Sequence, residues 1–230
     1  MAIRAVVFDA YGTLFDVHSV TTTAEHLFPG QGAAISTLWR DKQLEYTRII
    51  TMSGEVGPRG VPHYQPFWDV TLAALRYTAR RLGLAWNGEA EDQLMGEYYR
   101  LTAFPECDGV LRQLQSDGVP ATILSNGDPE MLAPVIANAG FTELFTAVMS
   151  VASVRRFKTN DEAYALGPKT LGIPAAELLF VSANCWDAIA ATWFGYTTMW
   201  INRHGHPLDP FGASPTFTGT SLTEVLGALL

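Results

Sequence analysis

The stretch RAVVFDAYGTLFD, residues 4–16, places one carboxylate directly after a short apolar run. A continuous run such as Ala5–Phe8 is typical of a strand that is buried on both faces, as in a parallel sheet. The tripeptide YGT at residues 11–13 then breaks the apolar pattern, as a loop does. Asp9 is therefore expected at the carboxyl end of a parallel strand, where open α/β sheets bind their ligands.

Length, composition and charge limit the class of protein. The chain has 230 residues, of which 48% are hydrophobic, so it can form one large domain or a core with a smaller domain. Its net charge of −8 argues against nucleic acid as a main partner, because phosphate binding needs a basic surface. A small anionic substrate remains compatible with this charge, since a few inward-pointing cations are enough to bind one.

The sequence also bears on the cellular location. No apolar run approaches the roughly 18 residues that span a bilayer, so we expect no membrane segment. Asp9 interrupts the first apolar run, so we expect no signal peptide. Cys107 and Cys185 lie far apart without CxxC spacing, which predicts neither a zinc site nor a disulfide framework. These features favour the reducing cytoplasm.

Five apolar runs have the character of strands, and helical patterns separate the last four of them. Helices are expected at residues 130–139, 161–171 and 187–194, and the first of these has Asp128 as its N-cap and Pro129 at its first position. This alternation predicts an α/β fold with a Rossmann-like parallel-sheet core and right-handed crossovers. The strands are expected at Ala5–Phe8, Ala121–Leu124, Thr146–Met149, Leu178–Val181 and Thr197–Ile201.

Residues 16–102 have a different pattern, with no convincing strand. Helices are expected at residues 18–28, 33–51, 67–82 and 89–100, and the Gly- and Pro-rich residues 53–66 form a loop near the substrate entrance. The simplest interpretation is an inserted helical cap domain at residues 15–102, with the core formed by residues 1–14 and 103–230.

The end of the chain carries two further signals. The capping box from Ser221 to Glu224 predicts a short final helix. The preceding residues 204–220 are rich in Pro and Gly, and are expected to be irregular.

Polar residues follow three of the predicted strands. Asp9 follows the first, Ser125 and Asn126 follow the second, and the segment SANCWD at residues 182–187 follows the fourth. Each of these alone is more often a turn former or a helix cap than a functional residue. Because the carboxyl ends of parallel strands meet at one edge of the sheet, their repetition favours a functional site there.

Five motifs in this order give the chain a specific resemblance: FDAYGTLFD, WRDKQLEYTR, LSNGDPEML, FKTNDEAY and FVSANCWD. It resembles the haloacid dehalogenase superfamily, and most closely its namesake branch, the L-2-haloacid dehalogenases. The wider superfamily consists mainly of magnesium phosphatases with a second Asp two residues after the first. Here Tyr11 stands at that position and cannot act as a carboxylate. Since Mg²⁺ prefers carboxylate and phosphate oxygens, we expect neither a metal nor another cofactor.

The resemblance implies hydrolytic dehalogenation of short 2-haloalkanoic acids, haloacetates included, to 2-hydroxy acids with inversion, in a protein that forms a homodimer. Asp9 would be the nucleophile that forms an ester, and Lys158 the cation that keeps it ionised. Arg40, Asn126 and Trp186 would hold the departing halide, and Ser125 the substrate carboxylate. The remaining matches are the catalytic residues Thr13, Tyr164, Ser182, Asn184 and Asp187 and the apolar wall of Tyr11, Leu44 and Trp186.

Other hypotheses remain open. A related hydrolase could use Asp9 to open another small electrophile, such as a strained-ring amino acid, and halide release from 2-chloropropionate or chloroacetate separates the two reactions. A catalytically silent binding protein on the same scaffold is disfavoured by the retained polar set. Two positions depart from the family pattern: Asp41 replaces a Gln beside Arg40, and Thr159 replaces the Pro that commonly follows the lysine.

Overall fold

A parallel six-stranded sheet forms the centre of the protein. The computed structural model describes residues 2–54, 56–57, 60 and 62–229. The strand order is β3-β2-β1-β4-β5-β6, and every pair is parallel. The strands are β1 (Ala5–Phe8), β2 (Ala121–Ser125), β3 (Ala147–Ser150), β4 (Leu178–Ser182), β5 (Thr197–Ile201) and β6 (Phe217–Gly219). The predicted α/β class and the five predicted strands are confirmed.

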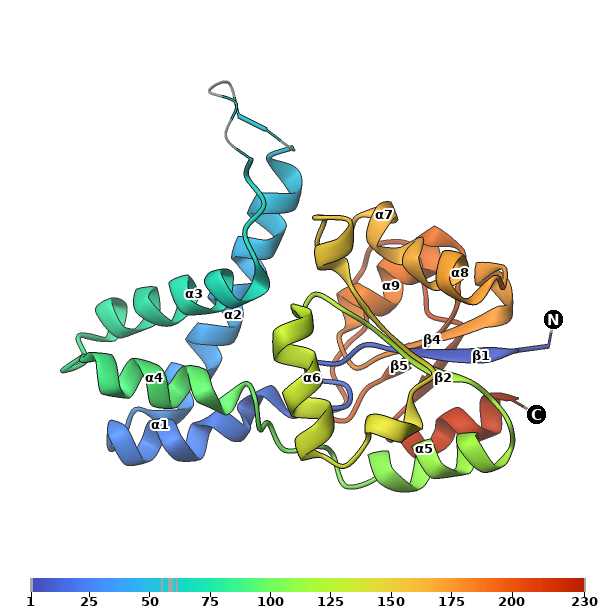
Figure 1. Ribbon diagram of the computed structural model, residues 1–230, viewed down its shortest axis with the longest axis horizontal. Helices are drawn as coiled ribbons and strands as arrows, with labels where there is room; N and C mark the ends of the chain where they lie inside the picture. Colours follow the sequence, from blue (N-terminus) through green and yellow to red (C-terminus); the bar gives the residue numbers. More distant parts are fainter. Residues whose placement is uncertain (1, 55, 58–59, 61, 230) are drawn as a thin grey trace.

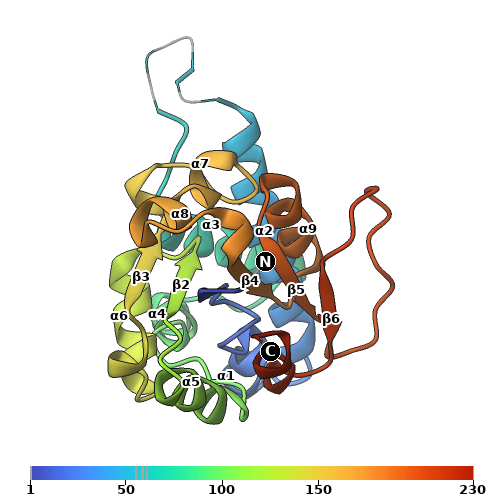
Figure 2. The same ribbon diagram turned by 90° about the vertical axis from the view of Figure 1, so that its right-hand side faces the viewer.

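Helices cover both faces of this sheet. Figures 1 and 2 show α5 and α6 on one face and α7, α8 and α9 on the other. This division follows from right-handed crossovers, because the chain moves outward in one direction from β1 to β3 and in the opposite direction from β4 to β5. The bounds are α5 (Cys107–Ser116), α6 (Pro129–Asn138), α7 (Asp161–Tyr164), α8 (Leu166–Leu171) and α9 (Cys185–Phe194).

Four helices form a separate layer beyond the carboxyl ends of the strands. They are α1 (Thr21–Leu27), α2 (Gly32–Met52), α3 (Phe67–Leu82) and α4 (Gly88–Glu97), and we call them the helical segment. The chain leaves and re-enters the core along two adjacent stretches, where the Asp16 N–H donates to the Thr102 carbonyl at 2.8 Å and the Phe104 N–H donates to the Leu14 carbonyl at 3.0 Å. The helical segment therefore faces the edge where the polar motifs meet (Figure 1).

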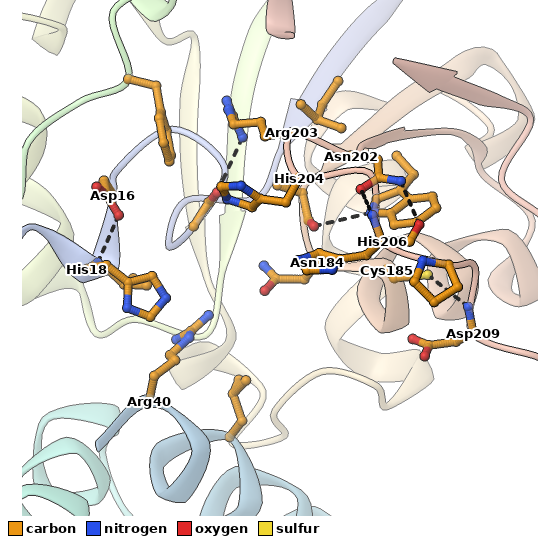
Figure 3. A pocket seen from close by; sticks show the side chains of 18 residues that line it. Asp16, His18, Arg40, Asn184, Cys185, Asn202, Arg203, His204, His206 and Asp209 are labelled. Atoms are coloured by element: carbon orange, nitrogen blue, oxygen red, sulfur yellow. Dashed lines mark hydrogen bonds between the residues drawn. The ribbon is translucent and has the colours of Figure 1, made fainter. Parts of the chain in front are cut away.

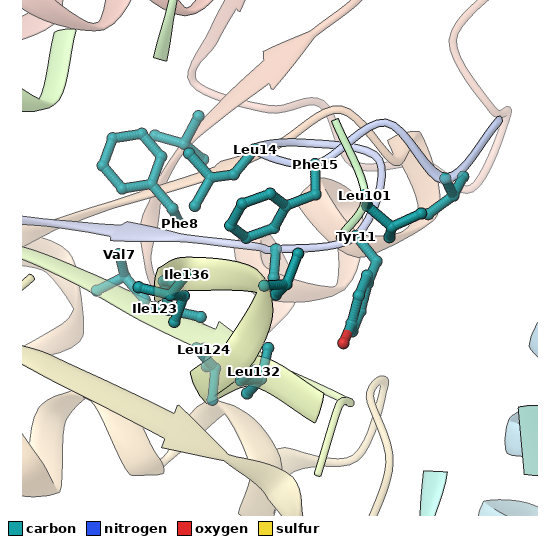
Figure 4. Packing of buried hydrophobic residues seen from close by; sticks show 14 of the residues in the cluster. Val7, Phe8, Tyr11, Leu14, Phe15, Leu101, Ile123, Leu124, Leu132 and Ile136 are labelled. Carbon is teal, nitrogen blue, oxygen red and sulfur yellow. The ribbon is translucent and has the colours of Figure 1, made fainter. Parts of the chain in front are cut away.

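The strand β1 carries Asp9 on a rigid base. All four of its residues are fully buried, and Figure 4 shows Val7 on one side of the strand near Ile123 and Ile136, and Phe8 on the other side near Leu14. Leu14 and Phe15, after the turn, return to the same core, while Tyr11 points away from it toward the helical segment (Figure 4). Burial on both faces leaves this strand little freedom, so the position of Asp9 is set by the core.

The structure differs from the sequence-based expectation in a few elements. Residues 204–220 are not wholly irregular, because Phe217–Gly219 forms β6 on the free edge of β5. This short strand has no local signature and exists because β5 offers unpaired backbone groups. The helix α5 was not predicted, although Val110, Leu111 and Leu114 give it a buried stripe. The final helix is present at Leu222–Leu229 as a 3₁₀ helix, with Glu224 accepting from the Ser221 N–H at 3.3 Å.

The predicted loop at residues 53–66 includes residues 55, 58–59 and 61, which lie outside the described residues. In its described part, Tyr64 packs on Phe157, with ring centroids 5.2 Å apart. The end of the loop thus packs against the core at Phe157, the residue that precedes Lys158. Within the described part of the chain, no helix is long and apolar enough to cross a membrane.

Candidate active site

Asp9 is the centre of a buried polar cluster at the carboxyl end of β1. Its side chain is nearly inaccessible, and the residue is 6% exposed. The Thr13 hydroxyl and the Asn184 side-chain amide each donate to Asp9 Oδ2 at 2.9 Å. The turn YGT brings Thr13 back beside Asp9, and Asn184 arrives from the turn after β4. Two donors therefore hold one oxygen of the carboxylate in place.

Lys158 supplies the positive charge of the cluster. Its Nζ lies 3.0 Å from Asp9 Oδ1 and 2.9 Å from Asp187 Oδ2, and the residue is only 1% exposed. Burial by itself would lower the pKa of Lys158, but the charges of Asp187 and Asp9 raise it above its ordinary value. Lys158 is therefore an ammonium at neutral pH, and it links the carboxylate that follows β1 with a carboxylate in the first turn of α9.

Asp187 is held from its other side by a tyrosine. The Tyr164 hydroxyl donates to Asp187 Oδ1 at 2.6 Å, and the Tyr196 hydroxyl donates to the Tyr164 carbonyl at 2.6 Å. Burial raises the pKa of Asp187, against the lowering effect of Lys158, and burial also raises the pKa of Tyr164 well above its ordinary value. Tyr164 is thus a neutral donor, and both oxygens of Asp187 have partners.

The turn after β2 lies beside Lys158. Asn126 Oδ1 accepts from the Lys158 backbone N–H at 2.9 Å, which leaves the amide Nδ2 as its donor end. Ser125 Oγ accepts from the Gly127 N–H at 3.0 Å, so its hydroxyl proton remains available to another acceptor. Ser182 has the same role after β4, accepting from the Asn184 N–H at 3.1 Å. Both serines shape turns in this structure.

Arg40 reaches the site from α2 of the helical segment. Its Nη2 donates to the Tyr11 carbonyl at 3.2 Å and its Nη1 donates to Gln43 Oε1 at 2.6 Å. Gln43 is fully buried and donates in turn to Thr71 Oγ1 and the Tyr98 hydroxyl. The guanidinium is therefore positioned by its own helical segment and contacts the loop that follows Asp9.

Tyr11 forms a wall between the core and the helical segment. Its ring lies 5.7 Å from that of Phe67 and 5.7 Å from that of Tyr98. A Cβ added to Gly127 would lie 2.6 Å from Tyr11 Cε2, so a glycine is required there for the ring to fit. The Tyr11 hydroxyl is buried and has no hydrogen-bond partner among the residues that the structure describes.

A cavity of about 500 Å³ opens beside this cluster. Arg40 and Leu44 line it from the helical segment, Asn184 lines it from the core, and the segment from Trp200 to Asp209 closes it. Figure 3 shows His204 and His206 among these lining side chains. Asp9 does not line this cavity, but Asn184, which donates to Asp9, does. The cavity is thus continuous with the outer side of the cluster.

The structure brings most of the predicted site residues together, and separates one of them. Trp186 is half-buried at the start of α9, its ring lies 5.3 Å from the Arg48 guanidinium, and it lines two outer grooves. The predicted residues that lie in or beside the cluster are Asp9, Tyr11, Thr13, Arg40, Leu44, Ser125, Asn126, Lys158, Tyr164, Ser182, Asn184 and Asp187. Asp41 is exposed in one of the same grooves as Trp186, away from the cavity that Arg40 lines.

Three further residues take part without having been singled out from the sequence. Gln43 could have been found from its spacing three residues after Arg40 on one helix face. Arg203 donates to the Thr13 carbonyl at 3.1 Å and to Glu106 Oε1 at 2.9 Å. No sequence pattern near Arg203 predicts these contacts. Asp128 occupies the N-cap position of α6, but its side chain makes no bond to that helix and accepts from the Trp68 N–H at 2.7 Å instead. The predicted N-cap position of Asp128, with Pro129 as the first residue of α6, is confirmed, but its side chain serves α3 instead.

Potential metal ligands do not gather elsewhere in the described part of the chain. Its His, Cys, Asp and Glu side chains form no group of three or more with the geometry of a metal site. The side chains of this cluster are two carboxylates, a buried ammonium, several neutral donors and a guanidinium. Together they can support covalent catalysis in which negative charge moves away from one centre.

Comparisons with known proteins agree with this chemistry. The family model of the haloacid dehalogenase-like hydrolases matches residues 3–195. The (S)-2-haloacid dehalogenase H-109 of Pseudomonas putida is 41% identical over 99% of this chain and 98% of its own. The haloacetate dehalogenase H-2 of Moraxella sp. (strain B) is 42% identical over 94% of this chain and 93% of its own.

Solved structures show the same likeness. The crystal structure of an L-2-haloacid dehalogenase is 53% identical and superposes with a TM-score of 0.95, covering 100% of this chain and 99% of its own. The L-2-haloacid dehalogenase from Xanthobacter autotrophicus, solved with chloropropionic acid covalently bound, is 36% identical with a TM-score of 0.87 over 97% of this chain and 96% of its own.

Proposed function

The chain belongs to the haloacid dehalogenase-like hydrolases, and on this premise we propose that it hydrolyses short 2-haloalkanoic acids, haloacetates included, to 2-hydroxy acids and halide. The observation that carries this function is the Asp9 carboxylate, held by Thr13 and Asn184 on one oxygen and by Lys158 on the other. Relatives of this name and a covalently occupied structure of the same fold support an ester intermediate on this residue.

The first step is displacement at the α-carbon. An oxygen of Asp9 attacks the carbon that bears the halogen, an O–C bond forms, and the halide leaves with the electron pair of the C–X bond. Asp9 Oδ2 accepts from two donors, whereas Oδ1 accepts only from Lys158 among the described residues, so Oδ1 has the lone pair that is open for this attack. Attack from the side opposite the halide inverts the α-carbon, and the (S)-acid is the substrate expected from the relatives' names.

The halide and the substrate carboxylate need donors of their own. Arg40 and the Nδ2 group of Asn126 are suited to the halide, because the Arg40 guanidinium is charged and Asn126 directs its amide oxygen away to Lys158. Ser125, with its available hydroxyl proton, is suited to the substrate carboxylate. Tyr11 and Leu44 provide apolar surface for the α-substituent. Trp186 takes part only if its ring moves from the outer groove toward the cavity.

The second step is hydrolysis of the ester. Water attacks Cγ of Asp9 and the Cγ–O bond to the substrate breaks. The product keeps the oxygen that Asp9 donated and takes up one proton of the water as its hydroxyl, while the other proton is released and Asp9 is again a carboxylate. Thr13 and Asn184, which donate to Asp9 Oδ2, stabilise the negative charge that develops on this other oxygen. Asp187 accepts the proton of the water, a role favoured by the raised pKa that burial gives it. Tyr164 and Ser182 keep Asp187 and the turn of Asn184 in position.

This reaction needs no metal ion. The ammonium of Lys158 stands between Asp9 and Asp187 and supplies the positive charge that a cation would otherwise bring. Tyr11 occupies the place of a second carboxylate, and the attacked atom is carbon rather than phosphorus.

Halide release tests the proposal. Wild-type protein with EDTA should release chloride from (S)-2-chloropropionate and from chloroacetate, whereas Asp9→Asn should release none above background. In a single turnover in H₂¹⁸O with excess enzyme, the first product should contain unlabelled oxygen and Asp9 should acquire the label. Label in the first product would refute the ester mechanism, and phosphate release that EDTA abolishes would point to a phosphatase instead.

Three further features belong to this proposal. The helical segment at residues 15–102 is a cap domain on a core of residues 1–14 and 103–230, which the paired exit and return of the chain supports. The protein forms a homodimer, which light scattering tests directly. It acts in the cytoplasm, which suits the free thiols Cys107 and Cys185.

A further inference from the structure

The helix α3 begins without a cap of its own. Its N-cap residue is Pro66, whose side chain cannot accept a hydrogen bond, and no side-chain cap bond forms within the helical segment. The first N–H groups of any helix lack partners in the helix and need an acceptor from elsewhere. At α3 that acceptor comes from the core, where Asp128 Oδ2 accepts from the Trp68 N–H at 2.7 Å.

This contact joins the two halves of the site over a long sequence distance. Asp128 is 6% exposed, and it lies 60 residues from Trp68 in the chain. It follows Ser125 and Asn126 in the same turn, so one turn of the core presents residues to the reaction and also accepts a hydrogen bond from the helical segment. Gly127, between them, leaves room for the Tyr11 ring.

The first residue of α3 carries the effect of this contact to the reacting groups. Phe67 is 1% exposed and stacks on Tyr11, with ring centroids 5.7 Å apart and planes at 24°. It also lies 6.1 Å from the ring of Phe157, the neighbour of Lys158. A shift of the start of α3 would therefore move the wall that packs against residues adjoining both Asp9 and Lys158.

We propose that Asp128 is a positioning residue for the dehalogenation, which caps α3 from the core and so holds Phe67 of the helical segment against the site. This inference rests on the proposed function for its effect on the reaction, but the cap itself does not depend on it. Asp128 does not touch the reacting atoms and acts through α3.

An acceptor oxygen, rather than a full negative charge, is what this cap requires. Burial raises the pKa of Asp128, although the amides of Trp68 and Phe67 lower it, and the acidic groups Glu130 and Asp69 nearby raise it further. The buried phenols of Tyr11 and Tyr64 also face Asp128 and are neutral. Asparagine offers a similar acceptor without a charge, so it should replace Asp128 well, whereas alanine should not.

Three variants test this inference. Asp128→Ala should lower kcat/KM for (S)-2-chloropropionate by about tenfold, because misplacement of a wall residue affects the bound geometry. Asp128→Asn should stay within about twofold of wild type. Glu130→Gln removes an exposed carboxylate two residues away and should change nothing. Hydrogen exchange of the full-length proteins should show faster exchange at the start of α3 in Asp128→Ala alone.

The two measurements separate the possible failures. Unchanged exchange at α3 in Asp128→Ala would overturn the cap, and faster exchange with wild-type kcat/KM would overturn its role in the reaction. An equal loss in Asp128→Asn and Asp128→Ala would also overturn the proposal, since the amide keeps the acceptor. If wild-type protein released no halide, the proposed function would fail, and exchange would still decide whether Asp128 caps α3.

Discussion

On the core side of the site, Asp9 and Asp187 are both held by the ammonium of Lys158, and all three side chains are buried by elements of the sheet. On the opposite side, the helical segment approaches through Arg40, which is only partly buried, and through Trp68, whose N–H bonds to Asp128. The first arrangement is held by a network of buried charged contacts, and the second depends on a few individual contacts. Under the proposed function, we expect the core to set the chemistry and the helical segment to set how the substrate is held.

The largest effect is expected from loss of the central cation. Lys158→Met would leave two carboxylates buried without their partner, and breaking such a pair costs about 3–5 kcal/mol of the free energy of unfolding. Halide release should fall to background at the same time, because the cluster loses its charge. Urea denaturation measures the stability, with Lys169→Met, an exposed lysine on α8, as the control.

If Lys158→Met were as stable as wild type, the buried charges on the core side of the site would not hold the fold more firmly than the contacts of the helical segment do. Activity alone cannot decide that point, since the variant loses it in either case. The urea midpoint therefore decides it, provided that the dependence of the free energy of unfolding on urea concentration is unchanged.

A substitution in the helical segment should lower kcat/KM and leave the stability of the fold almost unchanged. Arg40→Lys keeps the charge but loses the fork that contacts Tyr11 and Gln43 together, and kcat/KM should fall by about a hundredfold. The thermal midpoint should change little, because the side chain is only partly buried. Arg48→Lys, on the same helix, serves as the control, and an Arg40→Lys variant with wild-type kcat/KM would contradict the assignment.

The boundary between the two halves can be tested at Gly127. Gly127→Ala would place a methyl group 2.6 Å from Tyr11 Cε2, so the ring or the turn must move, at a cost of about 1–3 kcal/mol. Gly109→Ala, in α5, meets nothing within 4 Å and should stabilise the protein slightly. Calorimetry of the two variants measures the contrast, and equal midpoints would show that Tyr11 is not confined.

The smallest effect concerns pH and Asp128. Because burial raises its pKa, the folded protein binds a proton here more readily than the unfolded chain does. Its contribution to stability is therefore full below the ordinary aspartate pKa and declines as the pH rises through the folded value. Asp128→Asn lacks this decline. Its thermal midpoint relative to wild type should therefore rise slightly from about pH 4, near the ordinary aspartate pKa, to about pH 7.

Thermal melts across this range provide the measurement, with Glu143→Gln as the control for removal of an exposed charge that does not act on Asp128. A relative midpoint that falls toward neutral pH would show that the ionised carboxylate favours the folded state. In that case, the negative charge of Asp128 would strengthen the hydrogen bond to the Trp68 N–H beyond what a neutral acceptor provides.

Local sequence was a good guide where one motif sufficed. The apolar run before Asp9 predicted a buried strand, and the polar residues after β2 and β4 predicted the edge where Asn126, Asn184 and Asp187 now lie. Local sequence was a poor guide for side chains whose hydrogen-bond partners lie far away in the chain. The residues around Asp128 correctly predicted its position at the N-cap of α6, but nothing near it indicates that its side chain bonds to the start of α3. Arg203 was not singled out for the same reason.

The sequence by itself determined the parallel sheet, the helices inserted after β1 and the family of the chain, and it predicts Asp9 as the nucleophile. Each of these depends on short apolar runs and motifs that neighbouring residues define. Tertiary structure alone decided that Lys158 lies between Asp9 and Asp187, that Gln43 holds Arg40, that β6 extends the sheet, and that Asp128 serves α3. These contacts join residues far apart in the chain or satisfy groups left open by other elements. Their energy comes from burial and pairing in the folded protein, which no local pattern records.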